Sequence, residues 1–233
     1  YQQALAIARK LGAEDRIATF LIKIGTVYHA WGQYDKAIEN YQQALAIARK
    51  LGTEDGIAIS LNNIGGVYNS WGQHDKAIVN YQQALSLFRK LGKEDGIAIS
   101  LNNIGKVYNS WGQYDKAIEH YQQALAITRK LRMEGHIAVR LNNIGEVYIK
   151  RGEYEKAIEN FREALAIDRK LRRKDKIATR LNNIGMAYNS LGQYDKAIEY
   201  YQEALAIARK LGTDDRIASV LSNIGAAYYF GVV

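Results

Sequence analysis

The stretch LNNIGGVYNSWGQHDKAIVNYQQA, residues 61–84, decides how this chain folds. Its first half places apolar residues at Leu61, Ile64 and Tyr68, which is the spacing of one helix face. Gly72 then stands where a left-handed residue would end that helix, and the helical spacing resumes directly after it. The stretch therefore predicts two consecutive helices, over residues 55–71 and 74–91, joined by a tight turn.

The predicted helix pair recurs along the chain with a period of 40 residues. Residues 51–90 and 91–130 are identical at 32 of 40 positions. An aromatic column and a glycine column run through all copies: Tyr1, Tyr41, Tyr81, Tyr121, Phe161 and Tyr201, and Gly25, Gly65, Gly105, Gly145, Gly185 and Gly225. A fixed period of this size indicates one helical hairpin stacked on copies of itself. Proline, which would interrupt such helices, is absent from the 233 residues. We therefore predict an all-α fold.

The glycine column lies in the middle of the first helix of each hairpin. Glycine at such a position costs about 1 kcal/mol relative to alanine. Its recurrence indicates that the second helix passes too close to Gly65 and its equivalents for a Cβ atom. We expect the small residues Ala77 and Ala84 to make that approach, with Tyr68 and Tyr81 filling the flanking space.

The hairpin resembles the tetratricopeptide repeat. The resemblance rests on the columns of Leu61, Ile64, Gly65, Tyr68, Gly72, Ala77, Tyr81 and Ala84. Two features depart from the family's usual pattern, because the period exceeds 34 residues and arginine replaces the proline after the second helix. The longer period and the Leu-Asn-Asn-Ile-Gly run are similar to kinesin-light-chain-type and Leu-Gly-Asn-type repeats. The resemblance implies a right-handed α-solenoid with the first helix of each hairpin on its concave side.

The repeat pattern predicts a single array over residues 1–233, without a linker. Five full repeats are expected over residues 13–52, 53–92, 93–132, 133–172 and 173–212. A half repeat precedes them at residues 1–12, and another follows at residues 213–233. Because the sequence begins with Tyr1 in mid-repeat, we expect a fragment or a processed chain.

The residue types argue against catalytic chemistry. The chain has no cysteine, which excludes disulfides, thiolate metal sites and cysteine nucleophiles. The four histidines occupy four different columns: His29, His74, His120 and His136. Carboxylates recur with the period and form no singular pair of the kind that acid–base catalysis needs. No run of 18 apolar residues occurs that could span a membrane. We expect no enzyme activity, no metal, no cofactor and a cytoplasmic location.

Asparagines form a row on the face of the first helix that lies opposite the apolar stripe. Successive copies of this helix would stand about 10 Å apart. An amide offers both a donor and an acceptor, so such a row can bind the backbone of an extended peptide. The predicted groove residues are Asn62, Asn63, Asn102, Asn103, Lys106, Asn142, Asn143, Glu146, Asn182, Asn183 and Asn223. The alternative is that these amides bond the neighbouring helix or water.

Positive charge is concentrated in one part of the chain. The net charge is +8, and residues 131–180 hold 13 Lys and Arg against 8 Asp and Glu. The densest part comprises Arg169, Lys170, Arg172, Arg173, Lys174, Lys176 and Arg180. Cations at the end of the second helix complement its dipole, which explains the recurring Arg-Lys pair. The remaining cations could form a polyanion-binding patch, although no interleaved aromatics support base stacking, and we do not expect nucleic acid to bind.

The sequence therefore predicts a non-enzymatic scaffold that binds a protein or an extended peptide in the groove of the first helices. One alternative is a polyanion binder that works through residues 169–180. Another is an array that associates with itself end to end, through residues 1–11 and 221–233. The last segment is the most apolar stretch of the chain and lacks the polar cap that solenoid repeats usually need.

Overall fold

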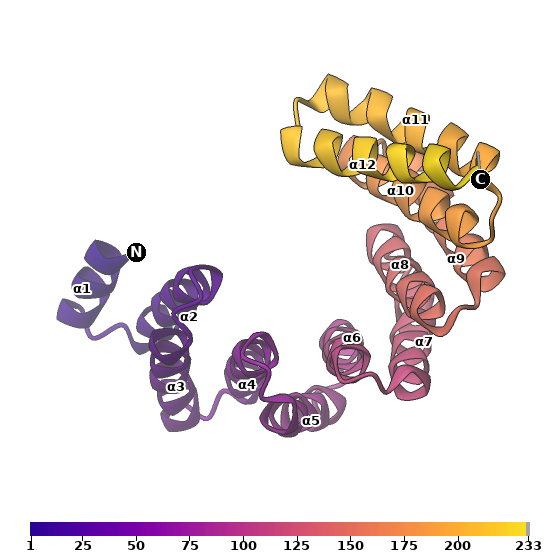
Figure 1. Cartoon of the computed structure of the whole chain (residues 1–233). Coiled ribbons are helices and arrows are strands. Elements are labelled where there is room, and N and C mark those ends of the chain that lie inside the picture. Colours follow the sequence, from indigo (N-terminus) through magenta and orange to yellow (C-terminus); the bar gives the residue numbers. More distant parts are fainter. Residues whose placement is uncertain (232–233) are drawn as a thin grey trace. The chain divides into compact units, whose positions relative to one another are not determined.

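A computed structural model describes residues 1–231, and within that range the chain forms twelve α-helices and no strand (Figure 1). The helices are α1 (Gln2–Lys10), α2 (Glu14–Ala30), α3 (Tyr34–Lys50), α4 (Glu54–Ser70), α5 (His74–Lys90), α6 (Glu94–Ser110), α7 (Tyr114–Lys130), α8 (Glu134–Arg151), α9 (Tyr154–Lys170), α10 (Lys174–Ser190), α11 (Tyr194–Leu211) and α12 (Asp214–Gly231). The all-α prediction is confirmed. The helices predicted over residues 55–71 and 74–91 are α4 and α5, within one residue at each boundary.

The helices pack as stacked hairpins within each of two compact units, Tyr1–Lys116 and the residues from Ala117 onward. In the first unit, α2 packs on α3 and α4 on α5, and α4 also contacts α2 and α6. In the second unit, α8 packs on α9 and α10 on α11, while α10 also contacts α8 and α12. The even-numbered helices of each unit thus form one layer, against which the odd-numbered helices pack.

Each hairpin turn follows from a left-handed residue just past the end of a helix. Gly72 has φ +77°, its N–H donates to Asn69 O at 3.1 Å, and Gln73 N–H donates to Tyr68 O at 2.8 Å. These two bonds satisfy carbonyls that the end of the helix would leave without partners. Arg132 and Arg172 adopt the same conformation, with φ +54°, at turns where other copies have glycine.

Aromatic rings of the odd-numbered helices lie against the glycines of the even-numbered helices. A Cβ atom on Gly145 would lie 2.5 Å from Phe161 Cε1, and one on Gly185 would lie 2.6 Å from Tyr201 Cδ1. Equivalent contacts join Gly25 to Tyr41 and Gly65 to Tyr81. The predicted exclusion of a Cβ atom is therefore confirmed at these four glycines, whereas Gly225 of α12 has no such neighbour within 4 Å.

The expectation that alanines make the close approach was wrong. Ala77 and Ala84 are fully buried, but the atoms nearest to a Cβ on Gly65 belong to the ring of Tyr81. The ring is the larger group, so the space that glycine vacates goes to a buried aromatic side chain. Burial in this position raises the pKa of Tyr201 to about 12, because the interior disfavours the phenolate.

The two glycines Gly145 and Gly225 allow a matched test of this packing. We expect Gly145→Ala to lower the free energy of unfolding by about 1–3 kcal/mol, because the new methyl group overpacks against Phe161. The new methyl group of Gly225→Ala meets no described atom within 4 Å, so this substitution should raise the free energy of unfolding by about 0.5–1 kcal/mol through helix propensity. Urea unfolding followed by circular dichroism measures both. Equal effects of the two substitutions would contradict the proposed close contact.

Candidate functional site

The asparagine row lies on the even-numbered helices, and its two columns differ in burial. The column of Asn63 is half-buried throughout: Asn63, Asn103, Asn143, Asn183 and Asn223. In the neighbouring column, Asn62 and Asn182 are half-buried as well. Asn102 and Asn142 are buried, with exposed fractions of 4% and 7%. These two side chains therefore lie between helices. The expectation that they flank an exposed stripe does not hold for them.

Several of these amides bond the neighbouring even-numbered helix. Asn183 Nδ2 donates to Asn142 Oδ1 at 3.0 Å, and Asn223 Nδ2 donates to Asn182 Oδ1 at 2.9 Å. In the first unit, Asn62 Nδ2 donates to Ser100 Oγ at 3.2 Å. The hydrogen bonds run from repeat to repeat within a unit. The alternative stated for the row, that its amides join adjacent helices, thus describes these three contacts.

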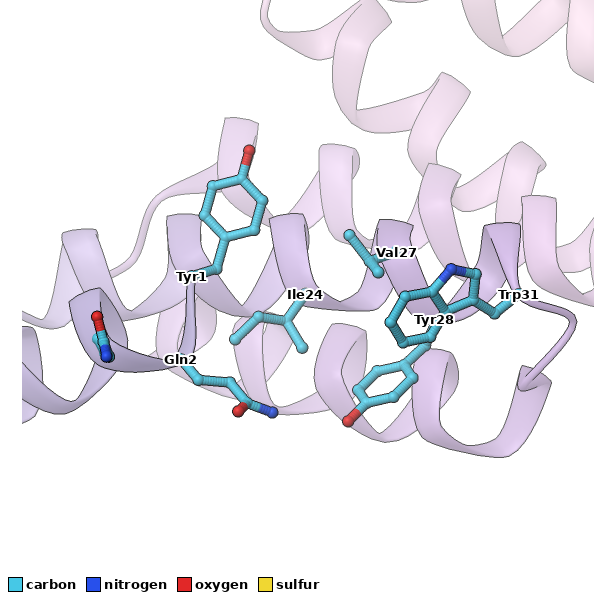
Figure 2. Close-up of a pocket in the computed structure, with 7 residues that line it drawn as sticks. Tyr1, Gln2, Ile24, Val27, Tyr28 and Trp31 are labelled. Atoms are coloured by element: carbon cyan, nitrogen blue, oxygen red, sulfur yellow. The ribbon is translucent and has the colours of Figure 1, made fainter.

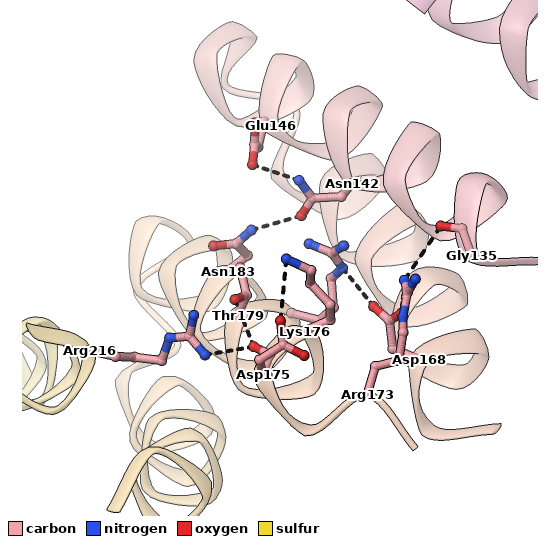
Figure 3. A network of polar contacts seen from close by, with 11 residues as sticks. Gly135, Asn142, Glu146, Asp168, Arg173, Asp175, Lys176, Thr179, Asn183 and Arg216 are labelled. Atoms are coloured by element: carbon pink, nitrogen blue, oxygen red, sulfur yellow. Dashed lines mark hydrogen bonds and ion pairs between the residues drawn. The ribbon is translucent and has the colours of Figure 1, made fainter. Parts of the chain in front are cut away.

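One of these bonds continues to the surface of the second unit. Asn142 Nδ2 donates to Glu146 Oε1 at 2.7 Å, so Asn183, Asn142 and Glu146 form a relay (Figure 3). Glu146 is exposed, as are Lys106 and Met186 at the equivalent position of α6 and α10. The relay fixes the orientation of both amides, because each Nδ2 group has an acceptor. Glu146 is therefore held on the surface by the amide of a buried asparagine.

A buried charge cluster lies beneath the basic segment. Asp168 of α9 is fully buried and accepts from Arg180 Nε at 3.1 Å and from Arg173 Nε at 2.8 Å (Figure 3). Arg180 is 4% exposed, and burial lowers its pKa while the charge of Asp168 opposes that shift. Arg173 Nη2 also donates to Gly135 O at 3.4 Å. The cluster ties α8, α9 and α10 together.

The same positions one repeat earlier show what happens without the acid. Thr128 stands at the place of Asp168, and Arg140 at the place of Arg180. Thr128 Oγ1 donates to carbonyls of its own helix. Arg140 Nε is buried and has no hydrogen-bond partner among residues 1–231. Burial accordingly lowers the pKa of Arg140. Asp168 therefore neutralises a buried arginine that would otherwise lack a counter-charge.

Sequence reasoning missed the role of Asp168, although the alignment of the copies contains a signal for it. Its column otherwise holds Ala8, Ala48, Phe88, Thr128 and Ala208. At the position equivalent to Arg180, two earlier copies have serine, Ser60 and Ser100. An acid that appears in an apolar column next to a new arginine predicts a buried ion pair.

Most cations of the basic segment have an acidic partner. Five of the seven make ion pairs: Arg169 with Glu203, Lys170 with Glu134, Arg173 and Arg180 with Asp168, and Lys176 with Asp175. Within residues 1–231, Arg172 and Lys174 are exposed and make no ion pair. The charge that the segment presents to solvent is thus smaller than its composition indicates.

An apolar hollow occurs at the start of the first unit. Ile24, Val27, Tyr28 and Trp31 of α2 line it together with Tyr1, Gln2 and Gln3, around a volume of about 450 Å³ (Figure 2). Trp31 is largely exposed, whereas the equivalent Trp71 packs on Tyr34 with ring centroids 5.7 Å apart. Trp31, at the edge of the hollow, is therefore more exposed than Trp71.

Clustered metal ligands and membrane-spanning helices were sought in the part of the chain that the structure describes. Residues 1–231 contain no group of three or more His, Asp or Glu side chains that could hold a metal ion. None of the helices in that range is long and apolar enough to cross a membrane.

The pair Asp168 and Arg180 supplies a test of the buried cluster. We expect Asp168→Ala to cost about 3 kcal/mol in unfolding free energy, because Arg180 is then buried without a counter-charge. The double variant Asp168→Ala/Arg180→Ser should recover most of the loss, since Ala48 and Ser60 occupy these positions in another repeat. Denaturant unfolding of the parent chain and of the two variants measures these free energies. A double variant no more stable than Asp168→Ala would refute the pairing.

Comparisons with known proteins agree with this architecture. No curated protein shows significant sequence similarity to the chain. Among solved structures, BtubC (BKLC) from P. vanneervenii is 22% identical with a TM-score of 0.81, over 91% of this chain and 89% of that chain. A putative kinesin light chain from Podosopora anserina is 22% identical with a TM-score of 0.71, over 85% and 97%.

A third similar structure is a regulator in complex with a peptide. The Rap conjugation gene regulator of the plasmid pLS20, in complex with the Phr* peptide, is 22% identical with a TM-score of 0.73. The match covers 91% of this chain and 59% of that chain. The sequence also matches the family described as Tetratricopeptide repeat, over residues 1–50, 56–130, 98–170, 136–210 and 176–231. Together the matches span nearly the whole length, and the chain belongs to the tetratricopeptide repeat family.

Proposed function

We propose that this chain is a non-enzymatic scaffold that binds a protein, through an extended peptide segment, on the face of its even-numbered helices. The observation that carries the proposal is the variation of exposed residues on this face. Lys106, Glu146 and Met186 occupy one column of helices whose core columns hardly change. Residues that vary on an otherwise constant framework are what a scaffold needs to distinguish one ligand from another.

The asparagine row supports the proposal through its remaining acceptors. Asn183 and Asn223 use Nδ2 to bond the preceding helix, and neither Oδ1 atom has a hydrogen-bond partner within residues 1–231. These oxygens can accept N–H groups from an extended backbone regardless of its sequence. In this proposal the asparagines hold adjacent repeats together with one end of the amide and contact the ligand with the other. The Rap regulator, which has the same fold, is itself a peptide complex.

The proposal assigns no polyanion site to residues 169–180. The five ion pairs in that segment leave Arg172 and Lys174 as its unpaired cations, and two exposed charges provide little of the affinity that phosphate backbones require. The Arg169–Glu203 pair has a counterpart in Arg129–Glu163, at a separation of 2.7 Å, one repeat earlier. Part of this charge therefore stabilises the stacking of repeats.

A second candidate function, self-association, is favoured by the exposed face of α12. Leu221 is 45% exposed, whereas Leu61 and Leu181 in the same column are buried. Gly225 lacks the aromatic neighbour that the equivalent glycines have, and Tyr1 of the aromatic column is exposed. A second copy would offer α1 to this face and so repeat the internal hairpin contact. Of the segment 221–233 named for this contact, residues 232 and 233 lie outside the described residues.

Peptides selected from a random display library on the immobilised chain test the first candidate. We expect the charge-reversal variant Glu146→Lys to weaken the selected peptides at least tenfold, because this side chain is exposed on the proposed face of the second unit. The control, Glu159→Lys, changes an exposed residue of the odd-numbered helix α9 in the same unit and should leave affinity unchanged. Calorimetry measures both. Peptides that bind both variants as tightly as the parent chain would place recognition elsewhere.

Sedimentation at two protein concentrations tests the second candidate. We expect the mean mass to rise with concentration, and Leu221→Arg to abolish the rise by placing a charge on the apolar face of α12. Val79→Arg is the control, since Val79 is equally exposed and its column tolerates Glu39 and Glu119. A constant monomer mass up to millimolar concentration would rule out the contact.

A further inference from the structure

A small cavity lies between α8 and α10 on the proposed binding face. It has a volume of about 280 Å³ and is lined by Glu146, Ile149, Lys150, Phe161, Asn183 and Met186. Its lining is mainly apolar. Phe161 is fully buried, because its ring is the one that packs against Gly145. Ile149 is half-buried and Met186 is 42% exposed, so apolar surface reaches from the interior to solvent here.

The side chains that shape this cavity are specific to one pair of repeats. Ile149 stands in a column that holds asparagine in three of the other copies, at Asn69, Asn109 and Asn189. Lys150 replaces the serine of Ser70, Ser110 and Ser190. Phe161 is the phenylalanine of a column that otherwise holds tyrosine. The sister repeats show that the fold does not need these residues at their positions, and a binding role would account for them.

We propose that this cavity receives one uncharged aliphatic side chain, of the size of leucine or methionine, from the bound peptide. The inference rests on the proposed function, since it names the residue type that the binding face selects. A volume of about 280 Å³ lies just below the range of pockets for drug-sized ligands, and it suits a single side chain. Burial of an aliphatic group against Ile149 and Met186 supplies the affinity.

The charges at the rim define what the occupant carries. Glu146 and Lys150 have opposite charges, so the rim as a whole is close to neutral. A charged side chain entering the apolar interior would lose its hydration without a counter-charge at the bottom, because Phe161 forms the floor. An uncharged aliphatic group meets no such penalty. The rim therefore complements a neutral residue.

The hydrogen bonds that join Asn183, Asn142 and Glu146 orient the polar groups beside the cavity. Asn183 donates through Nδ2 to Asn142, which donates to Glu146, so the orientation of all three groups is set. Asn183 lines the cavity, and its Oδ1 atom accepts no hydrogen bond within residues 1–231. A peptide backbone that places an aliphatic side chain in the cavity has an N–H group adjacent to that side chain, and this group can donate to Asn183 Oδ1. The shape of the cavity, the charges at its rim and the available hydrogen bond thus all favour a peptide with an uncharged aliphatic residue.

The two methionines of the chain make the cavity observable by NMR. Met186 lines the cavity, and Met133, the residue before α8, does not, so methyl-¹³C-methionine labelling gives one reporter and one internal control. We expect N-acetyl-L-leucinamide to shift the Met186 methyl signal saturably, with a dissociation constant on the order of 10 mM. N-acetyl-L-lysinamide and N-acetyl-L-glutamic acid amide should leave that signal in place, and Met133 should not respond to any of the three.

The variant Ile149→Asn tests the cavity without disturbing the fold, because Asn69, Asn109 and Asn189 occupy the equivalent positions. It should retain the helical circular dichroism of the parent and lose the leucinamide response. If helicity falls, Ile149→Ala replaces it, with the same expected loss. A Met186 signal that ignores leucinamide in the parent chain, or that follows lysinamide equally well, overturns the inference.

The display-selected peptides separate this inference from the proposed function. A selected peptide should shift Met186 but not Met133, and replacement of its aliphatic residues by alanine, one at a time, should identify one position that costs tenfold or more in affinity. A peptide that loses affinity in the charge-reversal variant, yet neither moves Met186 nor depends on an aliphatic residue, would refute the cavity assignment and leave the proposed binding face intact.

Discussion

The contact of an aromatic ring with a helix glycine is the constraint on which this structure depends. Without a Cβ atom at Gly145, the ring of Phe161 can lie directly against the backbone of α8. This contact sets the separation of the two helices in a hairpin, and the identical contact at Gly185 and Tyr201 sets it again one repeat later. The ring that closes the hairpin also forms the floor of the cavity between α8 and α10. Packing and candidate recognition therefore share one residue.

The sequence was sufficient to predict the hairpins, because a 40-residue period and glycine stops are local signals. It was insufficient to predict which polar column would be buried. Asn142 and Asn143 are adjacent on the same helix, yet Asn142 is buried and Asn143 is half-buried. Helical periodicity gives the direction of a side chain, whereas burial depends on how closely the next repeat approaches. The cavity was equally beyond prediction, since three helices contribute to its lining.

Polar residues between repeats show how an unusual residue is accommodated on a repeated framework. Asn142 is buried and has both an amide donor and a carboxylate acceptor as partners. Asn62 Oδ1, in the equivalent position of the first unit, is buried and has no hydrogen-bond partner in the described part of the chain. Asp168 and Arg180 likewise form a pair, whereas Arg140 Nε has no hydrogen-bond partner within residues 1–231. Buried polar groups are thus satisfied only where a second residue supplies the partner, because Asn189 Oδ1, in the same repeat as Arg180, also has no hydrogen-bond partner among the described residues.

The charged residues of the basic segment 169–180 mainly hold helices together and contribute little to the long-range attraction of a charged ligand. The chain carries a net charge of +8, but five cations of its most basic segment form ion pairs with carboxylates, and one of these pairs, Arg180 with Asp168, is buried. Paired charges contribute little to the field at a distance, because their potentials cancel over a few ångströms and salt screens the remainder. The variable face of α8 and α10, in contrast, combines apolar surface with oriented amides. At the proposed cavity, discrimination between side chains rests on shape and desolvation. Exposed charges of the proposed face, such as Glu146, contribute the part of the affinity that falls as the ionic strength rises.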